Sequence, residues 1–186
     1  MKPERDAELE NEVYENESFR GLDLSGLRTT RCTFRACDFT LAQINGSEHV
    51  GTDFANSTFE SANLFGARFS ECRLVGASFA GATLTGLTVE GGDWSYALLR
   101  GQELTNLELR GARLREADLS ETDLTDADLR GADLTRARLH NATLAGADLR
   151  EANLDGVDLS AARIAQARLD LAGAVQLARS LGAEVE

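Results

Sequence analysis

Large apolar residues recur at every fifth position from Phe19 to Leu169 without a change of register. Of the 31 positions in this series, 29 hold Leu, Phe, Ile, Val or Trp, and only Thr29 and His49 depart. Side chains on one face repeat every 2 residues in a β-strand and about every 3.6 in a helix, so neither element explains a period of five. A solenoid whose backbone turns a corner every five residues does explain it.

The positions around each large residue are also regular. A small side chain, most often Ala, stands two residues before it, and 14 of the 17 glycines stand two residues after it. Glycine suits a corner, where the backbone needs a positive φ or a close approach. The positions between are mostly Asp, Arg, Thr, Ser, Asn and Glu, which can remain solvated. The pattern therefore predicts an all-β rod with a narrow apolar interior.

Segments such as ADLSE, ADLRG, ATLAG and ANLDG share the pattern A(D/N)LXX, and through them the chain resembles the pentapeptide-repeat family over about four-fifths of its length. The resemblance implies a right-handed quadrilateral β-helix with four pentapeptides in each coil. At a spacing of ~4.8 Å between coils, the repeats would form a rod of roughly 37 Å. Phe19, Phe39 and Phe59 would then lie one above another.

The repeat divides the chain into three expected segments. Residues 1–13 lack the pattern and are acidic, which predicts a disordered tail or, alternatively, an acidic cap over the first coil. Residues 14–169 would form the β-helix. Residues 170–186 change to helical spacing, with Asp170 as N-cap and Gly182 as the stop, which predicts a helix over residues 170–181 followed by a short tail.

This C-terminal helix has two interpretations. It either caps the last coil or joins two copies of the chain in a homodimer. Apolar residues on more than one side favour dimerisation, because one coil end cannot cover them all. The expected dimer residues are Leu171, Ala174, Val175, Ala178 and Leu181.

One stretch of the repeat is irregular. The small position holds Leu87, Gly92, Gln102 and Leu107 instead of the usual Ala. This departure predicts a local bend or a widened coil between residues 87 and 107.

Composition excludes several kinds of protein. The chain has no apolar stretch as long as a membrane span and no signal peptide, so we expect a cytoplasmic protein that does not bind membranes. Cys32, Cys37 and Cys72 occupy small inward positions and are expected to be buried and unpaired, and His49 is expected to be buried and hydrogen-bonded. No catalytic constellation, metal-ligand spacing or phosphate-binding loop is present, so we expect neither an enzyme nor a metal or other cofactor.

Charge points to a basic protein partner. The formal net charge is −12, and residues 116–158 hold eleven acids against four arginines. These two coils would span ~10 Å with a net charge of −7, and B-DNA carries roughly six charges over that length. Direct binding to nucleic acid is disfavoured, because contact with phosphates needs a basic surface. Alternatively, Asp is frequent only because it is part of the repeat motif, and the acidic charge does not indicate a partner. The acidic residues expected to contact a partner are Glu116, Asp118, Glu121, Asp123, Asp126, Asp128, Asp133, Asp148 and Glu151.

Within the family, the stretch TLTGLTVEGGDWSYALLRGQELTNLELRG and the terminal LDLAGAVQLARSLGA are similar to the MfpA-like fluoroquinolone-resistance proteins. This resemblance implies a dimeric DNA mimic that binds DNA gyrase, a type II topoisomerase, and inhibits it or protects it from quinolones or other poisons. The alternative is a structural or scaffold protein of the same fold, whose basic partner is unrelated to topoisomerases.

Overall fold

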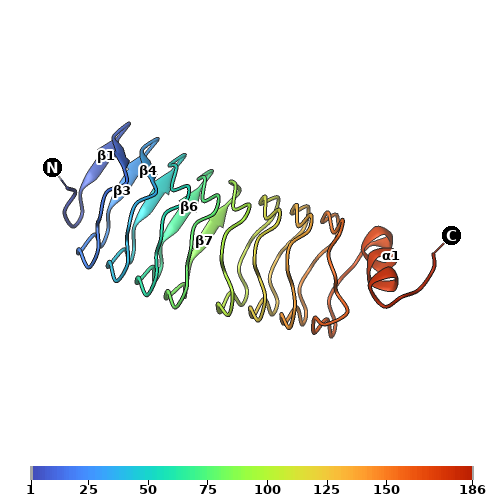
Figure 1. The fold of residues 1–186 in the computed structure, drawn as a ribbon. Helices are drawn as coiled ribbons and strands as arrows, with labels where there is room; N and C mark the ends of the chain where they lie inside the picture. The colour runs from blue at the N-terminus through green and yellow to red at the C-terminus, as the bar shows by residue number, and fades with distance from the viewer. Residues whose placement is uncertain (1, 186) are drawn as a thin grey trace.

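The computed structural model describes residues 2–185, which form a rod of stacked coils with one helix at its C-terminal end (Figure 1). Parallel bridges join residues that lie four pentapeptides apart, as between Asp118 and Arg138, so these residues lie one above another. The predicted quadrilateral β-helix with four pentapeptides in each coil is confirmed.

The strands are short because the backbone turns a corner every five residues. One parallel sheet contains, in order, β1 (Glu8–Glu10), β3 (Arg28–Thr30), β5 (Glu48–Val50), β6 (Arg68–Ser70) and β7 (Thr88–Glu90). On the next face β2 (Val13–Glu15) pairs with β4 (Thr33–Arg35). Single bridges continue the ladder on the other faces and in the later coils. Most large residues donate their backbone N–H to the coil above, as Phe59 does to Ser78 O at 2.7 Å.

We name the four faces after one core residue of each: the Leu64, Phe69, Leu74 and Phe79 faces. Each face contains that residue, its equivalents in the other coils, and the outward residues beside them. The core residues are buried, and in the Phe79 face the rings of Phe39 and Phe59 stack at 5.0 Å between centroids and 4° between planes. The predicted register is therefore confirmed.

The corners show why the chain places Gly two residues after the large one. Corner residues adopt a left-handed backbone whether or not they are Gly, with φ of 71° at Gly86 and 61° at Glu121. Gly adopts this conformation without the steric cost that a Cβ brings. The corner positions predicted from the sequence are confirmed.

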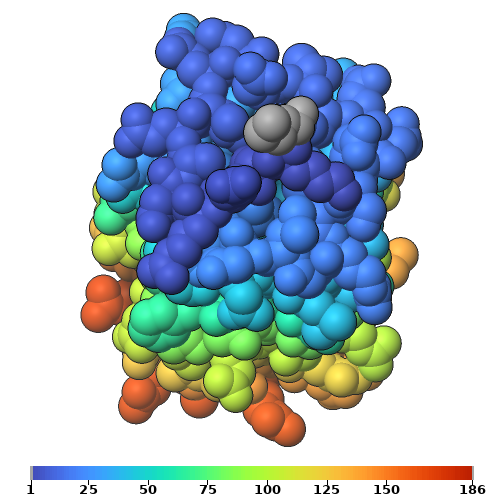
Figure 2. All heavy atoms as spheres, turned by 90° about the vertical axis from the view of Figure 1, so that its left-hand side faces the viewer, coloured from blue at the N-terminus to red at the C-terminus, as the bar shows by residue number. Residues whose placement is uncertain are grey.

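The prediction of a disordered tail over residues 1–13 is wrong for the residues that the structure describes, which agree instead with the alternative of an acidic segment that covers the first coil. Strand β1 pairs with β3 in this segment, and Arg28 N donates to Ala7 O at 2.9 Å. Half-buried Leu9 is in register with the core series, but the surrounding acidic side chains hide it in the sequence. Figure 2 shows the N-terminal segment lying across the end of the rod. Met1 lies outside the described residues.

The other end is closed by α1 (Leu171–Ser180). Asp170 is its N-cap and accepts from Gly173 N, and Gly182 follows the helix with φ of 86°, so the predicted helix and its signals are confirmed. Glu186, the last residue of the predicted tail, lies outside the described residues.

Helix α1 and its N-cap also form hydrogen bonds with backbone groups of the last coil that have no further coil to bind. Gln176 Nε2 donates to Val157 O at 2.8 Å, and Ser180 Oγ accepts from Leu159 N at 3.2 Å. Asp170 Oδ2 accepts from Glu151 N at 2.8 Å. The helix is therefore a cap that protects an open edge of the solenoid.

His49 is buried and hydrogen-bonded inside the rod, as expected. His49 Nδ1 lies 2.7 Å from Thr29 Oγ1, and its Nε2 lies 2.9 Å from Ser47 Oγ. Burial lowers the pKa of His49 to about 3, so the ring is neutral at physiological pH. The three cysteines are buried and free.

Candidate partner-binding surface

Aspartates of the repeat have a structural role. An Asp immediately before the large residue accepts a hydrogen bond from the backbone N–H two residues on. Thr125 N donates to Asp123 Oδ1 at 2.9 Å, and Ser120 N donates to Asp118 Oδ1 at 3.1 Å. This closed turn is the local interaction that Asp and Asn side chains favour. The frequent Asp of the motif therefore needs no partner to explain it.

The nine predicted contact acids differ in their place in the coil. Five are half-buried turn residues, namely Asp118, Asp123, Asp128, Asp133 and Asp148. The other four are exposed corner residues, namely Glu116, Glu121, Asp126 and Glu151.

The structure does not gather these nine acids on one face. The Leu64 face carries Asp123 and Asp126, and the Leu74 face carries Glu116 and Asp133. The Phe79 face carries Asp118 and Glu121, and the Phe69 face carries Asp128, Asp148 and Glu151. Together the nine acids surround the rod.

Arginines offset much of this charge on three faces. Arg115 lies 3.0 Å from Asp133, and Arg100 lies 2.6 Å from Glu121. Asp148 has three arginine neighbours, and the hydrogen bond from Arg150 is the main cause that lowers its pKa to about 2. Exposed pairs of this kind contribute little to stability, but they cancel the field that a partner would feel.

The Leu64 face is different. It carries no basic residue between Arg5 and Arg163. Over residues 2–185, no basic group forms an ion pair with Glu103, Asp123 or Asp126. These three acids lie on neighbouring coils of one face, and their charge is not compensated. Sequence reasoning missed Glu103, which a tally of charges at equivalent positions of successive coils would have found.

The predicted dimer residues form the outer side of α1. Leu171 and Leu181 are 82% and 67% exposed, Ala174 is exposed, and Val175 and Ala178 are half-buried. Gly173 and Leu177 face the last coil instead. A groove of about 670 Å³ separates the helix from residues 152–155 and is partly lined by Leu154, Leu171 and Val175.

Other exposed apolar side chains are scattered. Phe65 lies on the Leu64 face, Leu98 on the Phe79 face, and Tyr96 at a corner of the Leu74 face. Tyr96 donates its hydroxyl hydrogen to Glu116 at 3.2 Å.

Across residues 2–185, no group of three or more His, Cys, Asp and Glu side chains is placed to hold a metal ion. None of the helices in that range has the length and apolar character needed to cross a membrane.

Comparison with known sequences identifies the class of protein. The profile described as "Pentapeptide repeats (8 copies)" matches residues 37–74, 62–93, 95–131 and 132–170. These matches cover more than half of the chain, so it belongs to the pentapeptide-repeat family.

Two relatives are proteins named MfpA. The chain is 38% identical over 55 residues to the pentapeptide repeat protein MfpA of Mycolicibacterium smegmatis, which is 30% of this chain and 29% of that protein. It is 42% identical over 52 residues to MfpA of Mycobacterium tuberculosis, which is 28% of each chain. The chain thus matches less than a third of the length of these relatives.

The fold is also that of solved structures. A trypsin-treated form of QnrB1, a plasmid-mediated fluoroquinolone resistance protein, aligns with a TM-score of 0.81 at 24% identity, covering 98% of this chain and 92% of QnrB1. A second trypsin-treated form aligns with a TM-score of 0.74 at 22% identity, covering 97% of this chain and all of that one. At these identities the likeness shows the shared fold.

Proposed function

We propose that this chain is a binding protein, not an enzyme, and that it presents a DNA-like acidic surface to DNA gyrase or another type II topoisomerase. The resemblance to the gyrase-binding branch of the family supports the choice of partner. The net negative charge of residues 116–158 argues against direct contact with nucleic acid.

The uncompensated charge of the Leu64 face carries this proposal. Glu103 lies on one coil, and Asp123 and Asp126 lie on the next, ~4.8 Å away. A topoisomerase surface that binds DNA phosphates is basic, so it is attracted to a row of carboxylates on one side of a narrow rod. The acids of the other three faces add a weaker field because arginines stand beside many of them.

We further propose that α1 joins two copies through Leu171, Ala174, Val175, Ala178 and Leu181. Exposed Leu171 and Leu181 support this interface, since the hydrogen bonds that cap the last coil come from other residues of the helix. A dimer joined at this end would bring the two acidic segments to either side of its centre, in one longer rod.

In this proposal the protein acts in the cytoplasm, where its topoisomerase partner works. It either inhibits the enzyme or protects it from a quinolone or another poison. A supercoiling assay tests this directly. DNA gyrase is mixed with increasing concentrations of the protein, with and without a quinolone. We expect loss of supercoiling without drug, or recovery of supercoiling with drug, at micromolar protein.

A scaffold role is the second candidate, and the structure of the turns favours it. The turn aspartates have a local role, and several of them pair with arginine. If the protein changes neither reaction in the supercoiling assay, the acidic residues serve the fold, and the partner is not a topoisomerase.

A further inference from the structure

The ladder between two central coils is open on two adjacent faces. Elsewhere Leu64 N and Gly66 N donate to Thr83 O and Thr85 O at 2.9 and 3.0 Å. One coil later the equivalent bonds are not made, although every residue involved lies within the described range. The backbone N–H groups that lack the usual bond to the neighbouring coil belong to Gly81, Leu84, Gly86, Val89, Gly91, Glu103 and Glu108. We call this gap the seam.

The seam lies between the coils and not within them. The turn bonds inside each coil persist, as from Leu87 N to Leu84 O at 3.0 Å and from Leu107 N to Leu104 O at 3.3 Å. The two coils also stay joined on the Leu74 and Phe79 faces. Trp94 N donates to Arg113 O at 2.7 Å, and Phe79 N donates to Leu98 O at 3.0 Å.

Two leucines stacked in the small inward position explain the separation. Leu87 lies directly below Leu107. The next residues in this column are Ala67 below Leu87 and Ala127 above Leu107. Leu27 occupies the same column beneath Ser47, and there Glu48 N still reaches Leu27 O at 2.9 Å. A single leucine therefore fits the tube, while two in succession hold the coils apart, because an interior packed at crystal density has no spare volume.

Glycines mark the end of the seam. Gly91 and Gly92 both adopt a left-handed backbone, with φ of 65° and 87°, whereas a corner elsewhere uses one such residue. A Cβ at Gly92 would lie 2.4 Å from Cys72 O, so this backbone sits close against the coil below. Beyond it Arg113 N reaches Gly92 O at 3.2 Å, and the ladder resumes.

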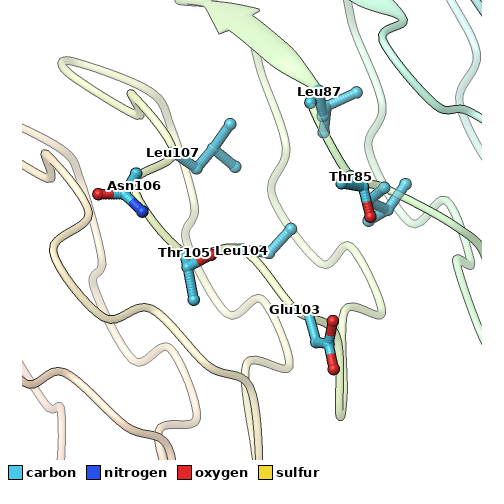
Figure 3. Close-up of a pocket in the computed structure, with 9 residues that line it drawn as sticks. Thr85, Leu87, Glu103, Leu104, Thr105, Asn106 and Leu107 are labelled. Atoms are coloured by element: carbon cyan, nitrogen blue, oxygen red, sulfur yellow. The ribbon is translucent and has the colours of Figure 1, made fainter.

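The gap contains a cavity of about 290 Å³. Figure 3 shows Leu104 and Leu107 pointing from one coil toward the coil that carries Thr85 and Leu87. The space leaves these leucines without full packing contacts, and the backbone groups at its edges lack protein partners. Both the hydrophobic and the hydrogen-bonded contacts that hold neighbouring coils together are therefore weakest here.

We propose that the seam is a hinge. The coils before it and the coils after it move as two rigid blocks, which stay bonded along the Leu74 and Phe79 faces and open and close along the Leu64 and Phe69 faces. The rod bends at the seam, because the pairs of coils on either side of it keep their ladder on the Leu64 and Phe69 faces.

Hydrogen exchange of the full chain tests the hinge at single residues. The amides of Leu84 and Gly86 should exchange at least about tenfold faster than those of Leu64 and Gly66, which are bonded at the equivalent positions one coil earlier. Leu107→Ala restores the usual residue and should slow exchange at Leu84 and Gly86 toward the rate at Leu64. Leu27→Ala, in the same column where the ladder is closed, should leave the contrast unchanged. Equal protection at the two pairs in the native protein would overturn the proposal.

Distances between spin labels test the bending itself. Labels at Phe65→Cys and Thr125→Cys span the seam on one face, and labels at Ser25→Cys and Thr85→Cys span the same number of coils on one side of it. Double electron–electron resonance should give a broader distance distribution for the first pair of labels than for the second. Leu107→Ala or Leu87→Ala should narrow the distribution of the first pair to the width of the second. Equal widths in the native chain would show a static gap and not a hinge.

Discussion

Individual aspartates in this chain have a structural role in the turns that does not depend on a partner. The same carboxylate that gives the coils their charge closes a turn, as Asp123 does with Thr125. Asn63 and Asn153 occupy equivalent positions and close their turns through the amide oxygen, both at 3.0 Å. Charge and turn formation can therefore be separated by an Asp-to-Asn change.

The turn role gives a direct prediction for Asp123. Asp123→Ala should lower the free energy of unfolding by about 1 kcal/mol, because the N–H of Thr125 loses its acceptor. Asp123→Asn should cost less than about 0.5 kcal/mol, since the amide keeps the bond. Chemical denaturation of the two variants measures the difference. If both lose the same stability, the carboxylate charge and not the turn bond is what matters.

His49 predicts how stability depends on pH. Its pKa is about 3 in the folded protein against an ordinary value of 6.5, so the unfolded chain binds the extra proton first. Its contribution to stability is complete above pH 6.5 and is lost as the pH falls toward 3. Between pH 7 and pH 5 the loss should reach about 2 kcal/mol.

Two variants separate the contribution of His49 to the pH dependence of stability from that of other groups. His49→Gln keeps hydrogen-bonding groups near Thr29 and Ser47 but does not titrate, so its stability should be nearly flat over the same range. Exposed His140→Gln should keep the native dependence. The aspartates with lowered pKa values act only below about pH 4. A His49→Gln protein with an unchanged pH profile would contradict the account.

At the scale of elements, the five-residue period predicted the core and the corners, because each position in the repeat has one environment. It failed at the N-terminus, where only Leu9 and Ala7 show the pattern among charged residues and β1 forms by pairing with β3. It indicated an irregularity at Leu87 and Leu107. The opening of two whole faces depends on stacking between successive coils, which a reading along the chain does not reveal.

Helix α1 combines two surfaces that separate variants can test. Leu171→Glu with Leu181→Glu changes only exposed residues and should convert the proposed dimer to a stable monomer in light scattering at tens of micromolar. Gln176→Ala with Ser180→Ala removes the bonds to Val157 and Leu159 and should lower stability while leaving the dimer intact at low temperature. A native protein that is monomeric at this concentration would show that the helix is only a cap.

At the scale of the whole molecule, the placement of charge matters more than its sum. Sequence reasoning counted acids along the chain and so favoured residues 116–158 as a unit. In the folded rod, a face collects equivalent residues of successive coils, and the arginines beside Asp118, Asp133 and Asp148 are their neighbours in space. The Leu64 face is the one that keeps its negative charge uncompensated over its central coils.

Binding of DNA gyrase to two matched triple variants tests this central claim most directly. One variant neutralises the Leu64 face with Glu103→Gln, Asp123→Asn and Asp126→Asn. The other removes the same charge from arginine-paired sites with Asp118→Asn, Asp133→Asn and Asp148→Asn, and Asn preserves the turns in both. Calorimetric titration at physiological ionic strength should show the first weakening binding by about tenfold or more and the second by about threefold or less. Equal losses from the two variants, or full affinity in the first, would contradict the account.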